Sequence, residues 1–383
     1  MLSAQVLNSV WIVDFLKVGR LKAKPKKTEW LLPIDFPVGD LFEVSEVLKT
    51  AGMLIPGYFA PDAGIYEPAV YFYAQDQGIR TIILPDRNVA SRIAQLVKGK
   101  ETVNDKQLKL SAALLGFAQL LNIDFEPGLS FHELAHRCGN TCAEEELGWF
   151  RAADNAPPED MLNVALGRTN RVSRTYAPVG APSLNLQLPL KRWNRNYITA
   201  LKILELDLSP GKQVDKMLHL LEWMSTSLVF AGPALMLACV YLGTHSPSRK
   251  GVFKNSRSAD RMAAIAGVRN AAWDITHLSD FIRRSNESVE PGNVQYLLAS
   301  FDTHLKLTTN LLMTVGREGS DASLIAAGLV QWWGTKDAQR IAHEVVIQLR
   351  RIHSDSHVPK TSGDPEYIPK LILLGERLVM GAI

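Results

Sequence analysis

The chain is poor in cysteine and lacks a large charge of either sign. Its 383 residues include only 3 cysteines, too few for a disulfide framework, and this scarcity favours a reducing compartment such as the cytoplasm. Lysine and arginine number 42 against 39 aspartates and glutamates, so the formal net charge is +3. This balance does not by itself indicate a nucleic-acid partner. Apolar residues at 46% and charged residues at 21% exclude a disordered tail, a collagen-like fibre and a coiled-coil rod.

Convincing export and membrane signals are also lacking. The first 20 residues have no basic segment before their apolar stretch, and Asp14 lies within that stretch, which is atypical of a secretory signal. The longest uncharged run lies between Trp223 and Thr244, but Gly232 and Pro233 interrupt it. We therefore expect a buried core helix at residues 224–243, with no membrane partner.

Several common catalytic motifs are missing as well. No P-loop, G-x-G-x-x-G or G-x-S-x-G motif falls between a predicted strand and a predicted helix. Nucleotide-driven chemistry and a serine-hydrolase elbow are therefore disfavoured. The tryptophans at 273, 332 and 333 are interpreted as core residues, since large aromatic side chains contribute more to packing than to exposed stacking platforms.

What the chain does contain is an alternation of buried-strand and helix patterns. Residues 79–85 (IRTIILP) form a continuous β-branched and apolar run, typical of a strand buried on both faces. Residues 296–302 (YLLASFD) predict a second strand that ends in an acid. Amphipathic or apolar helical patterns follow the first strand, at residues 89–99, 106–122, 129–139 and 143–154. This order predicts a heavily helical α/β fold with a parallel sheet.

Composition shifts predict how the α/β core is divided. Prolines and basic residues concentrate in its middle, so we expect a large helical insertion there and a predominantly helical part after the core. The predicted segments are an N-terminal segment (1–75), the first half of the core (76–155), the helical insertion with basic loops (156–258), the second half of the core (259–315) and a helical C-terminal segment (316–383).

Four carboxylates lie at predicted strand ends or in predicted helices. A buried charge at such a position loses hydration energy unless it has a partner or a functional role. Asp86 and Asp302 follow the two predicted strands, at the ends where α/β sheets place ligand-binding groups. Glu133 and Asp274 lie in predicted helices, and Asp274 is in an apolar stretch. Several converging carboxylates would repel one another, and oxygen-rich clusters select Mg²⁺ or Mn²⁺. A pair of such ions about 4 Å apart activates water for phosphodiester hydrolysis.

These motifs resemble PIN (PilT N-terminal) nucleases over residues 79–154 and 260–315. PDRN at Asp86 resembles the family's opening strand end, and the helix with Glu133 resembles its glutamate helix. AAWDITHL at Asp274 and SFDTHLK at Asp302 resemble its last two motifs, although the long gap before Asp274 requires an insertion. The resemblance implies a PIN-like sheet and a metal-dependent endoribonuclease, with all four acids as catalytic metal ligands. In a bacterium such an enzyme would often be a toxin or defence effector, with a protein inhibitor as partner.

A rival metal site overlaps the same helix. His132, Glu133 and His136 match H-E-x-x-H, in which two imidazoles on one helix face bind Zn²⁺ and the glutamate polarises a water. Arg137 fits that pattern poorly. Candidate third ligands are Glu144, Glu145, Glu146, Asp154, Cys138 and Cys142. A zinc-dependent hydrolase is therefore one alternative, and a non-enzymatic helical interaction protein with structural acids is another.

Basic segments give a weaker indication of RNA. Six of the eleven residues from Lys17 to Lys27 are basic, which is typical of a solvated linker or of an arm that attracts phosphates. Aromatic residues interleave with cations at 191–197, a pattern better suited to single-stranded RNA than to duplex DNA. A loop with further cations contains Arg249, Lys250, Lys254, Arg257 and Arg261. The sequence leaves homo-oligomer formation open.

Overall fold

The computed structural model divides the chain into two compact units, each built from two separate stretches of sequence. Unit 1 comprises Met1–Leu188 and Arg283–Phe301, and unit 2 comprises Pro189–Ile282 and Asp302–Ile383. The residues that the structure describes are 3–7, 10–14, 29–57, 64–180, 184–246, 251–288, 293–318, 321–354 and 364–381.

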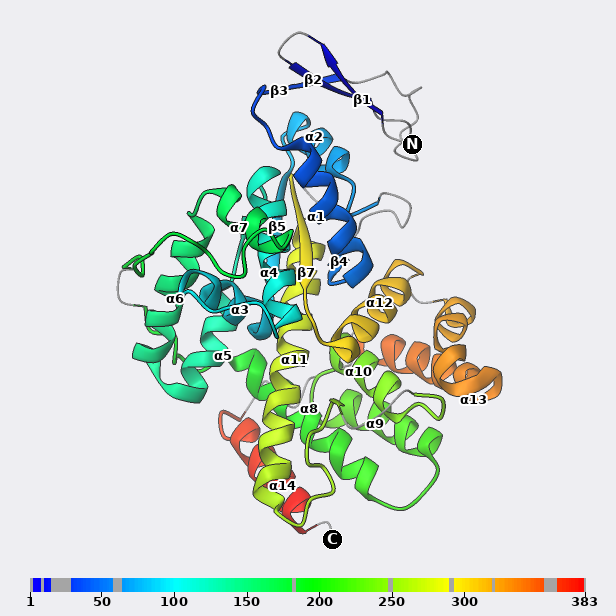
Figure 1. The fold of residues 1–383 in the computed structure, drawn as a ribbon. Helices are drawn as coiled ribbons and strands as arrows, with labels where there is room; N and C mark the ends of the chain where they lie inside the picture. Colours follow the sequence, from blue (N-terminus) through cyan, green and yellow to red (C-terminus); the bar gives the residue numbers. More distant parts are fainter. Residues whose placement is uncertain are drawn as a thin grey trace. The chain divides into compact units, whose positions relative to one another are not determined.

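Unit 1 contains a four-stranded sheet around which helices pack (Figure 1). Its strands are β4 (Leu54–Pro56), β5 (Arg80–Pro85), β6 (Asp124–Phe125) and β7 (Val294–Ala299), in the order β4-β7-β5-β6. β5 pairs in parallel with both β7 and β6, which confirms the parallel pairing expected from the two apolar runs. β4 pairs with β7 in the antiparallel sense, so the sheet is mixed, and the predicted parallel sheet is confirmed only for β5, β6 and β7.

The helices of unit 1 are α1 (Val38–Ala51), α2 (Pro68–Asp76), α3 (Arg87–Val97), α4 (Lys106–Leu120), α5 (Gly128–Cys138), α6 (Asn140–Asp154) and α7 (Pro158–Ala165). Four of them, α3 to α6, match the predicted helices, whereas α1, α2 and α7 were not predicted. In α3, Val89 and Ile93 lie one turn apart on the buried face, as the spacing of its apolar residues predicts. The sheet and helices share one core, in which Ile83, Phe117 and Leu297 are fully buried.

Three further strands occupy the N-terminal part of unit 1. They are β1 (Ser3–Leu7), β2 (Val10–Asp14) and β3 (Glu29–Leu32), and they form a separate antiparallel sheet in that order. The predicted basic arm at residues 17–27 lies outside the described residues.

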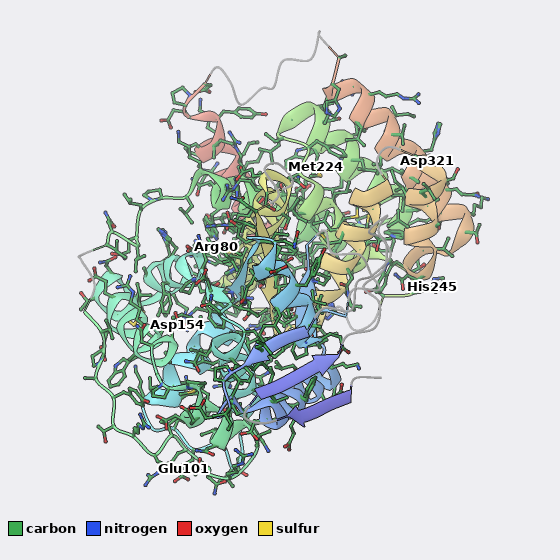
Figure 2. The ribbon with its side chains drawn as sticks, turned by 90° about the horizontal axis from the view of Figure 1, so that it is seen from above. Arg80, Glu101, Asp154, Met224, His245 and Asp321 are labelled. Carbon is green, nitrogen blue, oxygen red and sulfur yellow. A yellow bond between two sulfur atoms is a disulfide. The ribbon has the colours of Figure 1, made fainter. Side chains whose placement is uncertain are left out.

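Unit 2 is built from helices. They are α8 (Lys191–Leu208), α9 (Gln213–Ser227), α10 (Gly232–Leu242), most of α11 (Arg261–Glu287), α12 (Thr303–Glu318), α13 (Ala322–Ile352) and α14 (Tyr367–Gly381). Met224 of α9, labelled in Figure 2, is among the fully buried residues of their common core. Gly334 takes a left-handed conformation, with φ 71° and ψ 164°, and kinks α13.

The prediction of one buried helix at residues 224–243 is confirmed for α10 only, because α9 ends at Ser227 and residues 228–231 are not helical. Pro233 lies in the first turn of α10, where a missing N–H costs little, and every residue from Ala234 to Leu242 is buried. Among the described residues, no helix is long and apolar enough to span a bilayer. Trp332 and Trp333 pack into the same core, and the indole Nε1 of Trp333 donates a hydrogen bond to the carbonyl of Cys239 at 3.0 Å. These two tryptophans and Trp273 are buried, as predicted.

Candidate functional site

Asp86 lies where the carboxyl ends of two neighbouring parallel strands meet. It follows β5 and caps α3, and its Oδ1 accepts a hydrogen bond from the backbone N–H of Val89 at 2.8 Å. Its Oδ2 accepts a hydrogen bond from the hydroxyl of Ser300, the residue after β7. The backbone N–H of Asp86 donates to the carbonyl of Ala299 at 2.9 Å. The residue is only 4% exposed, in the position where open α/β sheets place their ligands.

The same edge of the sheet carries two polar residues that the sequence analysis missed. Glu126 follows β6, its backbone N–H donates to the carbonyl of Ile83 at 2.9 Å, and its Oε1 accepts from the N–H of Gly128 at 3.1 Å. The buried hydroxyl of Ser130 donates to the carbonyl of Pro85 at 2.6 Å. β6 is only two residues long, too short to show a strand pattern. The break at Pro127 and Gly128 was the one available signal that an element ends there.

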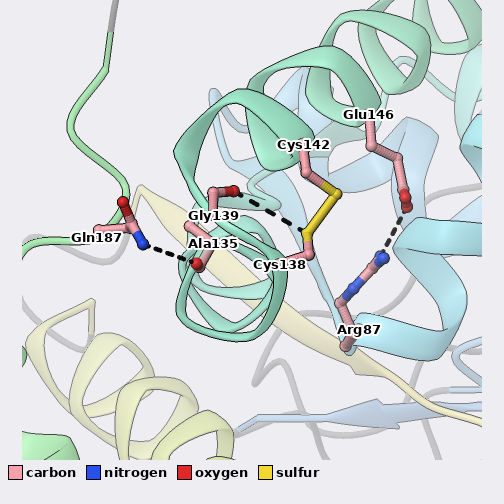
Figure 3. The surroundings of a disulfide bond; sticks show 7 residues. All are labelled: Arg87, Ala135, Cys138, Gly139, Cys142, Glu146 and Gln187. Atoms are coloured by element: carbon pink, nitrogen blue, oxygen red, sulfur yellow. Dashed lines mark hydrogen bonds and ion pairs between the residues drawn. A yellow bond between two sulfur atoms is a disulfide. The ribbon is translucent and has the colours of Figure 1, made fainter.

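Arg87, the residue after Asp86, forms an ion pair with Glu146 of α6. Nη1 of Arg87 is 2.8 Å from Oε1 of Glu146, and both side chains are at most one-fifth exposed. The pair joins the first residue of α3 to the middle of α6 (Figure 3). Removing either partner would leave a poorly solvated charge, so the pair holds these two helices in a defined relation.

The other three predicted ligands are divided between the units. Glu133 is half-buried on α5 in unit 1. Asp274, half-buried on α11, belongs to unit 2, as does Asp302, whose Oδ1 caps α12 by accepting from the N–H of Leu305 at 2.8 Å. The convergence of these acids with Asp86 stays a prediction.

The chemistry of Asp86 fits a cation ligand. Carboxylate oxygens are among the ligands that Mg²⁺ and Mn²⁺ prefer in proteins. Within the described ranges, no group of three or more His, Cys, Asp or Glu side chains is arranged to hold a metal ion. Metal binding therefore also stays a prediction.

The two histidines of the H-E-x-x-H string contact the backbone of residues 184–188, which we call the strap. Nδ1 of His132 lies 2.8 Å from the carbonyl of Leu186, and Nε2 of His136 lies 3.3 Å from the carbonyl of Leu188. Burial lowers the pKa of His132, and the charge of His136 lowers it further, whereas the hydrogen bond to Leu186 opposes both effects. The neutral imidazole therefore predominates at pH 7 and donates one N–H to the strap.

Most of the candidate third zinc ligands are engaged elsewhere. Oε1 of Glu144 accepts from the N–H of Leu184 at 2.9 Å, and Glu146 pairs with Arg87. Cys138 and Cys142 are joined to each other in a disulfide (Figure 3), a pairing that the low cysteine count did not predict. The two histidines each have a backbone partner in the strap, and zinc binding by the string stays a prediction.

The basic aromatic segment at 191–197 contributes its rings to the core of unit 2. Trp193 stacks on Tyr197 with centroids 4.9 Å apart, and Trp193 also contacts Trp273 at 5.7 Å. Tyr197 is buried, and Lys191 and Arg192 are exposed. The exposed residues of this segment are therefore its cations, whereas Trp193 is half-buried.

The second basic loop is described in part, because Arg249 and Lys250 lie outside the described residues. Arg261 is buried rather than solvated, and its guanidinium donates to the carbonyls of Val379 and Ser256. This arginine therefore ties the end of α14 to the start of α11 instead of facing a ligand.

Comparison with known protein families, with curated proteins and with solved structures gave no significant match.

Proposed function

We propose that this protein is a metal-dependent endoribonuclease with Asp86 as its central metal-binding carboxylate. The observation that supports the proposal is the burial of Asp86 at the junction of β5 and β7. An exposed aspartate would cap α3 equally well, and burying a carboxylate has a substantial desolvation cost. A buried acid at the carboxyl edge of a parallel strand pair stands where α/β sheets place ligand-binding groups, and this position supports a ligand-binding role.

The proposed ligand set adds Glu133, Asp274 and Asp302 to Asp86. Asp302 is two residues beyond Ser300, the residue whose hydroxyl contacts Asp86. A bound Mg²⁺ or Mn²⁺ would supply an acidified water and would offset the charge that develops on the phosphodiester. The role of the four carboxylates is to hold and orient that cation, and Ser300 fixes the orientation of the Asp86 side chain. Single-stranded RNA is the proposed substrate.

The proposal predicts Mn²⁺-dependent cleavage of single-stranded RNA that depends on Asp86. Asp86→Asn preserves an oxygen to cap α3, because asparagine is as good an N-cap as aspartate, but it removes the negative charge. We expect the variant to fold and to lose cleavage by at least about 100-fold, since metal-ligand charge is a main contributor to such catalysis. The measurement is RNA cleavage with Mn²⁺ and with a chelator, for the wild type, Asp86→Asn and Asp302→Asn.

His136→Ala and Glu101→Gln are the matched controls, and both should retain cleavage. Loss of activity in His136→Ala, with retention in Asp86→Asn, would identify a zinc-dependent hydrolase instead. A wild-type protein that neither cleaves RNA nor gains thermal stability from Mn²⁺ would contradict the proposal and favour a helical interaction protein.

A further inference from the structure

The disulfide between Cys138 and Cys142 joins the end of α5 to the start of α6. It bridges the bend between the two helices at Gly139, which we call the corner. α5 ends at Cys138 and α6 begins at Asn140. Gly139 between them has φ 95° and ψ 162°, a backbone conformation that residues other than glycine rarely adopt. In a continuous helix, residues four apart are already neighbours, and a bond between them would constrain little. Because Gly139 interrupts the helix, this disulfide fixes the direction in which α6 leaves α5 (Figure 3).

The strap docks on both sides of this corner. On the α5 side, the two histidines bind the carbonyls of Leu186 and Leu188, and Nε2 of Gln187 donates to the carbonyl of Ala135 at 3.3 Å. On the α6 side, Oδ1 of Asn140 accepts from the N–H of Leu186 at 2.7 Å, and Glu144 accepts from Leu184. Figure 3 shows Gln187 reaching Ala135 beside the disulfide. The short strap can keep its hydrogen bonds to α5 and to α6 at the same time only while the angle between the two helices stays fixed.

Both sulfurs are accessible to a reductant, because Cys138 and Cys142 are exposed. The third cysteine, Cys239, is buried in the core of unit 2, and burial raises the pKa of its thiol to about 12. Cys239 is therefore a poor participant in exchange, since the thiolate is the reactive form. Reduction would act on the Cys138–Cys142 pair alone.

We propose that the Cys138–Cys142 disulfide is a redox latch that holds the strap on the α5–α6 corner. A thiolate of a dithiol reductant attacks one cysteine sulfur, breaks the S–S bond and forms a mixed disulfide. The second thiolate of the reductant then closes a cyclic disulfide and releases the second cysteine. The cysteine pair gains two electrons and two protons, the reductant loses the same number, and the freed corner loosens its hold on the strap. This inference does not depend on the proposed nuclease activity.

Hydrogen–deuterium exchange of the full-length protein tests the latch. With dithiothreitol, a peptide covering residues 184–188 should exchange at least about tenfold faster, because the hydrogen-bonded amides of Leu184 and Leu186 open more often. The internal control is a peptide covering residues 176–180. Its Val179 N–H donates to the carbonyl of Gly148 at 2.9 Å, further along α6 than the disulfide, and its exchange should not change.

A Cys142→Ser variant separates the disulfide from other effects of the reductant. It should show fast exchange at 184–188 both with and without dithiothreitol. Equal exchange in the oxidised and reduced wild type would overturn the latch. So would a Cys142→Ser variant that still responds to dithiothreitol, or free thiols at both positions after treatment with glutathione disulfide.

Discussion

Asp154 is a carboxylate whose environment favours its protonated form. It is the last residue of α6, and burial raises its pKa to about 6, with a further contribution from the negative charge of Asp124. Asp124 is itself paired with Arg80, whose Nη2 lies 2.7 Å from its Oδ2. Figure 2 labels Asp154 and Arg80 in unit 1. Since the ordinary aspartate pKa is 3.8, the folded protein binds a proton here more tightly than the unfolded chain does.

The raised pKa of Asp154 predicts a loss of stability as the pH increases. The folded state holds the extra proton between pH 4 and pH 6, so the free energy of unfolding should fall across that window by up to about 3 kcal/mol. Asp154→Asn carries no titrating group. We expect it to be more stable than the wild type by about 1–3 kcal/mol at pH 8 and nearly equal to it at pH 4.

Urea unfolding at pH 4, 6 and 8 measures this difference. Glu101→Gln, a change at an exposed acid, is the control, and its stability should vary with pH as that of the wild type does because it keeps Asp154. A difference between Asp154→Asn and the wild type that is the same at every pH would contradict the argument.

The strands β5 and β7 and the helix α3 were predictable from the sequence, whereas the short strands β4 and β6 and the helix α1 were not predicted. The apolar stretches at 82–85 in β5 and at 296–299 in β7 were recognisable as strands, and α3 as a capped amphipathic pattern. β4 has three residues and β6 two, so neither contains a period that could be recognised. The mixed character of the sheet follows from β4 and was therefore missed.

The candidate site shows the same limit. Asp86 could be placed at a strand end, because the strand precedes it directly in the sequence. Its contact with Ser300 joins positions 214 residues apart, and the contact of His132 with Leu186 joins positions 54 apart. Local spacing carries no information on such partners. The H-E-x-x-H string is thus equally compatible with a metal and with a backbone carbonyl as the partner of its imidazoles.

The positive φ of Gly139 predicts that a substitution at this position lowers the free energy of unfolding. A Cβ at Gly139 would have nothing within 4 Å, so Gly139→Ala should act only through its φ of 95°. We expect a loss of about 1–3 kcal/mol in the free energy of unfolding, the usual cost of such a conformation.

Gly39→Ala is the matched control. Gly39 also has nothing within 4 Å of the added Cβ, but it lies in α1 with no positive φ. Alanine there should stabilise the helix by up to about 1 kcal/mol. Urea unfolding compares the two variants, and equal effects at both positions would contradict a conformational origin.

Across the whole molecule, the chain passes between the two units at three points, after residues 188, 282 and 301. Unit 1 therefore depends on a strand supplied from late in the sequence. β7 lies between β4 and β5, and its Leu297 and Ala299 are fully buried in the core. Neither unit corresponds to one continuous stretch of sequence.

A fragment of residues 29–188 should consequently fail to fold cooperatively. It lacks β7, so β4 has no partner and β5 loses one of its two neighbours. We expect no cooperative urea transition and a weak near-ultraviolet circular dichroism signal, both of which report fixed tertiary packing.

The control restores the strand by joining residues 293–301 to the fragment through a long Gly/Ser linker, whose closure cost rises only slowly with length. Cooperative unfolding should return in this fusion. If the fragment without β7 already unfolds cooperatively at the same urea concentration as the fusion, the dependence on β7 is wrong.

The late position of β7 also affects how the protein is made. The ribosome completes β5 at residue 85, but β7 begins only at residue 294. At about 5–20 residues per second, roughly ten to forty seconds separate the two strands. Throughout that interval one side of β5 has no partner in the nascent chain, and an unpaired strand edge is a template for pairing with other chains. Newly synthesised molecules are therefore most prone to aggregate before residue 299 emerges, and chaperones that cover exposed strand edges should act on them in this period.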